Sequence, residues 1–333
     1  MQYHTNFSLK NHNTFGIDVK AKKFISVKTL QELKDVLQEN ESVFLLGGGS
    51  NMLLTEDIDK TVVHIDLSGV IVNNQNENTV EVTAAAGENW HEFVLWCIEQ
   101  DFGGLENLSL IPGNVGTCPI QNIGAYGFEV KDTIVSLDAL NKKTLKIETF
   151  TNADCDFGYR NSVFKNELKD QYIIINVTFK LTTQNHQTNT SYGAIQEELK
   201  NINKPSLKDI SNAVIAIRNS KLPNPKEIGN SGSFFKNPVI DVTLYEKLKE
   251  KFSEIPSYPI SETQVKVPAG WLIEKAGFKG KRFGEAGVHS KQALVLVNYG
   301  NATGKEIFEI AKKIQRKIKT EFEIPLEIEV NVF

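Results

Sequence analysis

The chain has 333 residues. At a usual size of about 150 residues per domain this is enough for two domains, so a short peptide or a minimal disulfide scaffold is excluded. With 40% hydrophobic and 23% charged residues the composition is that of ordinary globular proteins, which excludes a disordered or collagen-like chain. The net charge of -4 comes from dispersed charges, so the sequence lacks the basic patch of a nucleic-acid-binding protein and favours small-molecule ligands.

Cysteine usage and the N-terminal segment bear on the cellular compartment. Cys97, Cys118 and Cys155 are far apart and form no Cys-x-x-Cys pair, so neither a disulfide framework nor a zinc site is expected. The histidines show no metal-ligand spacing either, and we expect no metal. The chain begins without a basic and then apolar leader and has no apolar run of about 18 residues. We therefore expect a cytoplasmic, unanchored protein.

Alternating strands and helices are expected in the first part of the chain. Thr29 and Glu32 form a capping-box pattern before a short amphipathic helix that ends near Asn40. Residues 42–46 and 61–67 have the pattern of buried strands. These elements indicate a compact α+β lobe.

A second, mostly antiparallel lobe is expected after residue 80. Asn89 is a candidate N-cap of a helix. Residues 133–140 and 144–150 are predicted to form a hairpin, and residues 172–181 a further strand. A helix that begins at Ser206 must stop before the proline-rich sequence Leu222-Pro223-Asn224-Pro225, which we take as the main domain boundary.

Two helices and a terminal strand are expected beyond this boundary. Residues 268–277 form a short helix with proline near its start and glycine at its end. Thr303 caps a long amphipathic helix, and after Pro325 the alternation of apolar and polar residues predicts a strand over 326–332.

Two glycine-rich segments are candidate binding loops. Gly47 to Asn51 follow a predicted strand, and such backbone can turn its N–H groups toward a phosphate, although an ordinary tight turn fits as well. The segment is not a P-loop, and Met52 breaks the dinucleotide fingerprint. Residues 111–127 carry four glycines and no charge, which suits the flat, partly polar ring of a cofactor, with a plain surface loop as the alternative.

Four further residues have an unremarkable interpretation when each is taken alone. An isolated arginine such as Arg160 is usually a surface ion-pair partner, and a serine on a glycine turn such as Ser233 usually caps the backbone. Glu327 and Glu329 fit the solvated face of a terminal strand.

Taken together, these segments resemble one family, the UDP-N-acetylenolpyruvoylglucosamine reductases (MurB), over nearly the whole chain. Tyr192, in the segment 182–200, further resembles the subgroup (type I) with an inserted loop that folds over the substrate. The resemblance is carried by eight motifs in order: Asn13 to Ile17, LLGGGSN, Gly104 to Gly127, FGYRNSVFK, KLPNPK, GNSGSFFKNP, AGWLIEKAG and QALVLVN.

The resemblance implies an α+β protein. Its FAD-binding unit has two lobes and is of the vanillyl-alcohol-oxidase (PCMH) type, and a separate α+β domain binds the substrate. The implied ranges are 1–67 and 68–218 for the two FAD-binding lobes, 219–323 for the substrate-binding domain, and 324–333 for a C-terminal strand that returns to the FAD-binding unit.

The resemblance also implies the reaction. NADPH reduces FAD and leaves, and UDP-N-acetylglucosamine enolpyruvate then binds and is reduced to UDP-N-acetylmuramate for peptidoglycan. Arg160 matches the family's charge-stabilising arginine, Ser233 the proton donor and Glu329 the completing carboxylate. The terminal strand departs from the family pattern at Ile328 and Asn331, so Glu327 stays a rival to Glu329.

Binding residues are implied in the same way. FAD is expected to bind noncovalently, with Cys118 the one caveat, and the enzyme to be a monomer without a nucleic-acid or membrane partner. A flavin oxidoreductase with another substrate and a catalytically altered nucleotide-sugar sensor remain alternatives. The implied substrate contacts are Tyr192, Lys221, Asn237, Tyr258, Lys266 and Gln292. The implied FAD contacts are Gly47, Gly48, Gly49, Ser50, Asn51, Pro112, Gly113, Gly116, Thr117, Gln121, Asn122, Gly124, Ala125 and Tyr126.

Overall fold

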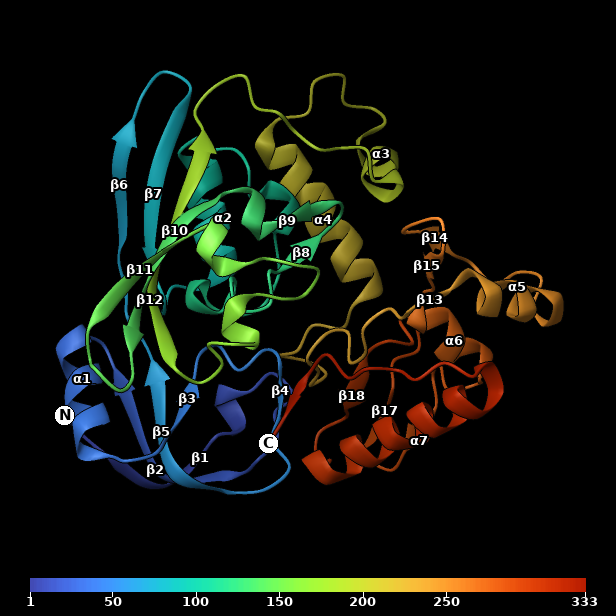
Figure 1. Ribbon diagram of the computed structural model, residues 1–333, viewed down its shortest axis with the longest axis horizontal. Helices are drawn as coiled ribbons and strands as arrows, with labels where there is room; N and C mark the ends of the chain where they lie inside the picture. The colour runs from blue at the N-terminus through green and yellow to red at the C-terminus, as the bar shows by residue number, and fades with distance from the viewer. The chain divides into compact units, whose positions relative to one another are not determined.

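The computed structural model describes every residue from Met1 to Phe333 (Figure 1). The chain folds into two compact units, each assembled from segments that are separate in the sequence. The first unit consists of residues 1–7, 21–48 and 59–220, and the second of residues 8–20, 49–58 and 221–333.

The first unit contains a four-stranded sheet covered by one helix. The strand order is β1-β2-β5-β3, and β3 runs parallel to β5. The helix α1 (Leu30–Glu39) starts at the predicted capping box, in which the Thr29 side chain accepts from the Glu32 N–H and the Glu32 carboxylate accepts from the Thr29 N–H. The strands are β1 (His4–Ser8), β2 (Lys20–Val27), β3 (Val43–Leu46) and β5 (Ile58–Ile65).

A second sheet of five strands completes the first unit. Its order is β11-β10-β12-β7-β6, and every neighbouring pair is antiparallel, as predicted for this part of the chain. The strands are β6 (Val70–Gln75), β7 (Thr79–Ala85), β10 (Ile134–Asn141), β11 (Ile147–Thr151) and β12 (Tyr172–Thr182). In the two-stranded ribbon of β8 (Gly124–Ala125) and β9 (Phe128–Glu129), β8 lies in the predicted binding loop and β9 directly follows it.

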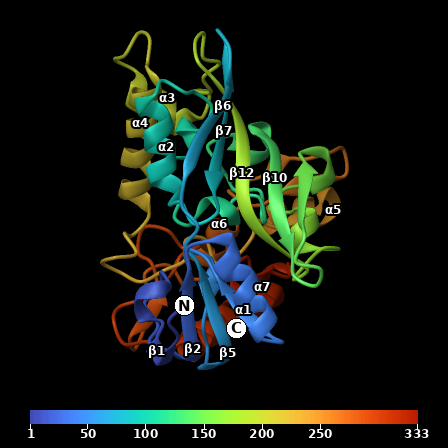
Figure 2. The same ribbon diagram turned by 90° about the vertical axis from the view of Figure 1, so that its left-hand side faces the viewer.

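Three helices pack in this unit beside the second sheet. In Figure 2, α2 (Trp90–Glu99) and α4 (Leu207–Lys221) lie on one side of β7 and β12. The ring of Phe179 on β12 is 5.9 Å from that of Trp90 and 5.2 Å from that of Phe93, so aromatic packing fixes α2 on the sheet. The short helix α3 (Gly193–Leu199) packs on α4 through a small apolar cluster.

The second unit contains three small sheets. One is the parallel pair of β4 (Met52–Leu53) and β19 (Asn331–Val332). The order of the second is β13-β15-β14, and that of the third is β16-β17-β18. Their strands are β13 (Val239–Asp241), β14 (Tyr258–Pro259), β15 (Gln264–Lys266), β16 (Arg282–Phe283), β17 (Ala286–Val288) and β18 (Leu296–Asn298).

Three helices complete the second unit. The longest, α7 (Gly304–Phe322), begins at the predicted Thr303–Glu306 capping box and contacts β17 and β18. Its predicted apolar stripe is buried, because the residues from Ile307 to Ile318 that repeat every three or four positions face the core. The other helices are α5 (Val242–Lys251) and α6 (Ala269–Lys275).

The end of the chain departs from the predicted strand over 326–332. Only Asn331 and Val332 form a strand, and a single bridge between Phe235 and Ile328 holds the residues before it. The strand is interrupted because its two ends pair with different segments. Residues 326–329 are hydrogen-bonded to residues 234–236, whereas β19 pairs with β4.

Two short segments of the N-terminal region belong to the second unit. Hydrogen bonds from Asn230 N–H to Thr14 O, 2.9 Å, and from the Asn298 side chain to Phe15 O, 2.9 Å, tie residues 8–20 to it. A Cβ on Gly229 would lie 2.1 Å from Phe15 O, so this close approach requires glycine. Sequence ranges alone therefore describe the units incompletely.

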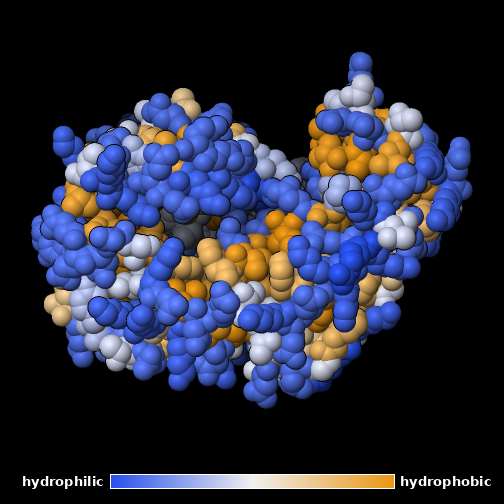
Figure 3. Space-filling view, turned by 60° about the horizontal axis from the view of Figure 1, so that its bottom comes forward, coloured by the Kyte–Doolittle hydropathy of each residue, from blue (hydrophilic) through white to orange (hydrophobic).

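The helices and the face shown in Figure 3 can be compared with what a bilayer requires. None of the helices is both long enough and apolar enough to cross a bilayer. On the face shown in Figure 3, hydrophilic residues predominate and apolar residues form separate patches among them.

Candidate functional site

The glycine turn after β3 is packed backbone to backbone against the predicted binding loop. A Cβ on Gly47 would lie 2.9 Å from the methyl group of Thr117, and one on Gly48 would lie 2.6 Å from Asn114 Oδ1 and 2.9 Å from Gly113 Cα. No larger residue fits at either position without displacing the loop. The packing therefore requires glycine, and a turn without side chains can direct its N–H groups toward a phosphate.

Backbone hydrogen bonds hold the loop 111–127 in place. Gly113 O accepts from Trp90 N–H, 3.0 Å, at the start of α2, and Gly116 N–H donates to Ala86 O, 2.9 Å, at the end of β7. The Thr117 hydroxyl donates to Asn114 O, 2.7 Å. Because these bonds link the loop to a helix and a strand, it is a fixed platform rather than a free surface loop.

Asn122 differs from its predicted role as an FAD contact. The residue is fully buried, and its side-chain amide donates to Gly158 O, 3.0 Å, and to Glu129 Oε2, 3.1 Å. Its side-chain oxygen accepts from Lys131 N–H, 3.2 Å. Asn122 therefore supports the loop from inside, and it has no exposed atom with which to touch a ligand.

Arg160 belongs to a separate segment and contacts this loop. One guanidinium nitrogen donates to Gly124 O at 2.7 Å, and the guanidinium carbon is 5.5 Å from the ring centre of Tyr159. Its backbone has a φ of 54°, a left-handed conformation that is uncommon for arginine. The structure thus brings the predicted charge-stabilising residue to the predicted FAD loop within the first unit.

Tyr126 and Tyr192 also meet in the first unit. Their rings are 5.2 Å apart and nearly perpendicular, and Tyr192 is 47% exposed at the start of α3. The segment before Tyr192 is attached to the loop through the Asn107 amide, which donates to Asn189 O at 2.8 Å, and the Asn189 amide, which donates to Gly127 O at 3.3 Å. These bonds join the predicted inserted segment to the predicted cofactor loop.

Ser233 is exposed in the second unit, on a turn that Gly232 forms with a φ of 68°. Its backbone bridges to Val295, and the following residue Phe234 donates its N–H to Leu294 O at 2.8 Å. The Ser233 hydroxyl makes no hydrogen bond with the protein. The backbone is thus held while the hydroxyl is free to meet a ligand.

The two terminal glutamates have different surroundings. Glu327 forms an ion pair with Lys236, and its side chain is 69% exposed. Glu329 is half-buried, and its N–H donates to Phe234 O at 2.9 Å, next in the chain to Ser233. This pairing places Glu329 beside the serine turn, whereas Glu327 lies opposite Lys236, farther from Ser233.

Other predicted substrate residues gather around the start of α6. Asn237 Oδ1 accepts from Ala269 N–H, 2.9 Å, which satisfies one free donor of the helix. A Cβ on Gly270 would lie 3.2 Å from Gln292 Oε1, so these two residues are neighbours. On the adjoining sheet Tyr258 pairs with Lys266, and Tyr258 is 58% exposed.

The predicted residues divide between the units. The first unit brings together Gly47, Gly48, the loop 111–127, Arg160 and Tyr192. The second unit contains Ser233, Glu329 and the predicted substrate residues Lys221, Asn237, Tyr258, Lys266 and Gln292. It also contains Gly49, Ser50 and Asn51, and Asn51 O accepts from Asn331 N–H at 3.2 Å.

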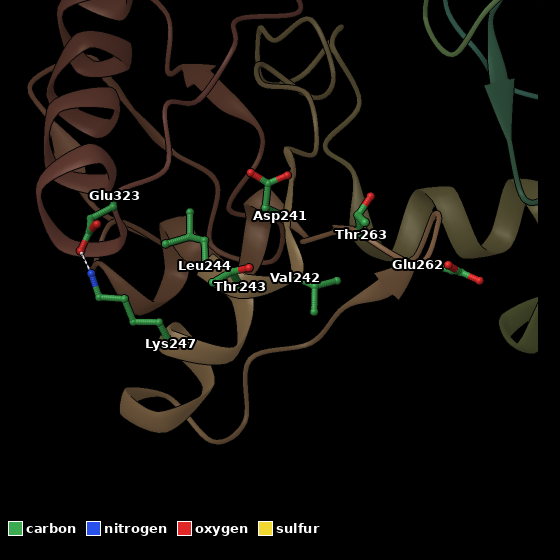
Figure 4. A pocket seen from close by; sticks show the side chains of 8 residues that line it. All are labelled: Asp241, Val242, Thr243, Leu244, Lys247, Glu262, Thr263 and Glu323. Carbon is green, nitrogen blue, oxygen red and sulfur yellow. Dashed lines mark hydrogen bonds and ion pairs between the residues drawn. The ribbon is translucent and has the colours of Figure 1, made fainter.

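A surface hollow on α5 is not this site. Figure 4 shows that Lys247 already pairs with Glu323, at 2.6 Å, and that the other charged residues in the hollow are Asp241 and Glu262. An acidic hollow repels an anionic diphosphate, and none of the predicted site residues lines it.

Sequence reasoning missed one charged residue near the loop, Arg218 on α4. It lies four residues after the buried Val214, on the face that turns toward the core. Arg218 occupies a position of the predicted helix where the apolar stripe would place a buried residue. This could have identified it, because a buried charge needs a partner.

Two family models match the chain. Residues 21–147 match the FAD binding domain, and residues 224–333 match the C-terminal domain of UDP-N-acetylenolpyruvoylglucosamine reductase. Full-length relatives decide the family. The reductase of Flavobacterium johnsoniae is 62% identical, and the alignment covers 100% of each chain.

The chain belongs to the UDP-N-acetylenolpyruvoylglucosamine reductase family. Reductases of Amoebophilus asiaticus and Pseudomonas putida are 47% and 45% identical, with 100% of this chain and 99% of theirs covered. The crystal structure of the reductase (MurB) from Thermus caldophilus has a TM-score of 0.68 at 23% identity and covers 100% of this chain and 98% of its own. That likeness confirms the fold. By membership in this family the chain is a flavoprotein oxidoreductase of peptidoglycan synthesis, with FAD as cofactor and NADPH as reductant.

The first unit fits a noncovalently bound FAD. Its glycine turn lacks side chains where a diphosphate needs backbone N–H groups, and its loop is uncharged where a flavin ring needs a flat surface. Cys118 is buried, and burial raises its pKa well above the ordinary value. The thiolate that a covalent flavin link requires is therefore suppressed.

Proposed function

We propose that Arg160, Ser233 and Glu329 carry the reduction of UDP-N-acetylglucosamine enolpyruvate to UDP-N-acetylmuramate. The observation that supports this most directly is the turn at Ser233, where a hydroxyl without a protein partner lies next to Phe234, whose carbonyl receives the Glu329 N–H at 2.9 Å. A proton donor must be unoccupied in the enzyme and held at a fixed position, and this serine meets both conditions.

The chain's own residues have three tasks in this reaction. When bound, FAD takes a hydride from NADPH and supplies it to the methylene carbon of the enolpyruvyl group. The Ser233 hydroxyl then gives its proton to the neighbouring carbon, which serine can do only because that carbon has become strongly basic. The Arg160 guanidinium stabilises the negative charge that spreads into the substrate carboxylate. Glu329 is the carboxylate that completes the set of catalytic residues.

The roles of the binding residues follow from their chemistry. Lys221 and Lys266 are point charges that suit the diphosphate of the UDP-sugar, and Tyr258 offers an exposed ring. Asn237 and Gln292 are held by backbone neighbours and so present fixed amide groups. Tyr192 would contact the substrate from the segment attached to the loop at Gly127.

The two alternatives gain no support of their own. A nucleotide-sugar sensor was suggested by Asn331 in place of the family arginine. The Asn331 side chain donates to Asn51 O at 3.0 Å, so it has a structural use that is compatible with an active enzyme. The second alternative, a flavin enzyme for another substrate, does not account for the motifs around Ser233 and Lys221.

Replacing Ser233 with alanine tests the proposal. We expect NADPH to reduce the flavin of the Ser233→Ala variant at the wild-type rate, while reoxidation by the enolpyruvyl substrate slows by about 10²-fold or more, the usual contribution of a general acid. Stopped-flow absorbance of the flavin separates the two half-reactions. Equal slowing of both would remove Ser233 from this role.

We further propose that the enzyme is a cytoplasmic monomer, and that residues 1–67, 68–218 and 219–323 serve as two FAD-binding lobes and a substrate-binding domain, with 324–333 returning to the FAD-binding unit. The cytoplasmic location rests on membership in the reductase family. Light scattering of the purified enzyme tests the oligomeric state, and a dimer mass at micromolar concentration would contradict the monomer.

A further inference from the structure

Arg218 is a partly buried cation without an anionic partner. It lies near the end of α4, its Nε atom is shielded from solvent and has no hydrogen-bond partner, and it forms no ion pair. The Tyr126 phenol interacts with the guanidinium. Arginine keeps its proton at any physiological pH, so the positive charge is present whether or not it is compensated.

The surroundings of Arg218 lead to the loop 111–127. Ser211, two turns earlier on the same helix, meets Ser109 with 2.7 Å between their hydroxyl oxygens, so this face of α4 lies on the segment that enters the loop. His91 on α2 accepts from Leu110 N–H at 3.0 Å. Burial lowers the pKa of His91, the Glu92 carboxylate raises it, and the charge of Arg218 lowers it, so His91 lies within electrostatic reach of both side chains.

A buried guanidinium without a counter-charge is unfavourable unless something else supplies the negative charge. The neighbouring phenol, imidazole and hydroxyls are not anionic at neutral pH. The carboxylate that acts on His91, Glu92, is exposed and forms no ion pair with Arg218. The compensating anion is therefore expected to come from a ligand. The planar guanidinium offers paired donors that match phosphate oxygens.

We propose that Arg218 binds the diphosphate of a nucleotide ligand, and that this ligand is the FAD. The guanidinium is next to Tyr126, which belongs to the loop that packs on Gly47 and Gly48, and this loop lies in the part of the chain that matches the FAD binding domain. The inference requires FAD binding and is independent of the catalytic roles proposed for Ser233 and Glu329.

The test compares Arg218→Met and Arg218→Lys with the wild-type holoenzyme. The control is Lys208→Met, which removes one positive charge from an exposed position of the same helix. FAD release after dilution is followed by the rise of free-flavin fluorescence. We expect the FAD dissociation constant of Arg218→Met to rise at least about tenfold, the effect of losing a charge-assisted hydrogen bond. The dissociation constant of Arg218→Lys should rise less. The dissociation constant of Lys208→Met should stay within about twofold of the wild-type value.

Melting temperatures distinguish ligand binding from a structural role. If Arg218 awaits an anion, methionine at this position leaves the flavin-free protein as stable as wild type or more stable, and the rise in melting temperature on adding FAD becomes smaller. A flavin-free Arg218→Met protein that melts earlier, with an unchanged rise on adding FAD, would show a structural role and overturn the proposal.

A second titration identifies the source of the diphosphate. UDP is added to FAD-loaded enzyme, and its affinity is measured by calorimetry. Unchanged UDP affinity together with weakened FAD binding supports FAD as the ligand. Weakened UDP binding with unchanged FAD binding assigns Arg218 to the UDP-sugar and overturns FAD as the ligand, and no change in either affinity overturns the proposal completely. Neither measurement involves turnover, so a failure of the catalytic proposal for Ser233 cannot be mistaken for a failure here.

Discussion

Glutamine in place of Glu329 removes a carboxylate while it preserves the size of the side chain. Glu329 is half-buried beside the serine turn, and its N–H donates to Phe234 O at 2.9 Å, a bond that glutamine keeps because it belongs to the backbone. The substitution therefore tests the carboxylate alone. Glu327→Gln is a matched control two residues away, where the same change acts on a 69% exposed side chain paired with Lys236.

The two substitutions are expected to differ in how much they slow the reaction. An exposed ion pair such as that of Glu327 contributes about 0–1 kcal/mol to stability, and Glu327→Gln should leave catalysis unchanged. A carboxylate that completes proton transfer contributes about 10²-fold or more to the rate, equivalent to about 2.7 kcal/mol in the barrier. We therefore expect Glu329→Gln to slow the substrate half-reaction by about 10²-fold with little change in melting temperature.

Stopped-flow traces of the flavin measure this difference. In both variants NADPH should bleach the flavin at the wild-type rate, and only Glu329→Gln should then show slow return of the colour when the enolpyruvyl substrate is added. The reasoning fails if Glu327→Gln slows the second step as much as Glu329→Gln does. It also fails if Glu329→Gln turns over at the wild-type rate.

Two further predictions concern the packing of the glycine turn and the histidines. Gly48→Ala should cost about 1–3 kcal/mol and weaken FAD retention, because the new Cβ lies 2.6 Å from Asn114 Oδ1, whereas Gly193→Ala meets nothing within 4 Å and should be neutral in urea unfolding. Burial lowers the pKa of His64 and His91 below 6.5, so the unfolded chain binds more protons there. Stability should be complete above pH 6.5 and fall as the pH drops through the folded-state pKa, and a melting temperature that does not change down to pH 5 would contradict this.

Elements with local signals were predictable from the sequence. The capping boxes at Thr29 and Thr303 mark the starts of α1 and α7 to the residue, and Asn89 marks the start of α2. Each signal is a hydrogen bond between residues three apart, so no knowledge of the rest of the fold is needed. The predicted hairpin is likewise present as β10 and β11.

Elements that depend on distant partners were not predictable. The strand expected over 326–332 is divided into two short pairings because its neighbours, residues 234–236 and β4, are two different segments far away in the sequence. The attachment of residues 8–20 to the second unit rests on single bonds such as that between Asn298 and Phe15 O. No periodicity in the sequence encodes such contacts.

The candidate site shows the same division. Arg160 and the glycine turn stand in recognisable motifs, and their position at the loop 111–127 agrees with that pattern. The polar residues of that loop look alike in the sequence, and only burial separates the internal Asn122 from those that can face a ligand. Arg218 has no motif of its own, since its position near Tyr126 depends on how α4 packs.

The discontinuity of the two units limits how this enzyme can be taken apart. The chain passes from one unit to the other at residues 7/8, 20/21, 48/49, 58/59 and 220/221, so no single cut in the gene separates them. A fragment of residues 221–333 would lack β4, the partner of β19, and the carbonyl of Phe15 that receives the Asn298 amide. We expect such a fragment to aggregate when expressed alone. An exchange of units between related enzymes must transfer three separate segments together, so shuffling at one crossover would yield chimeras with half-built cores.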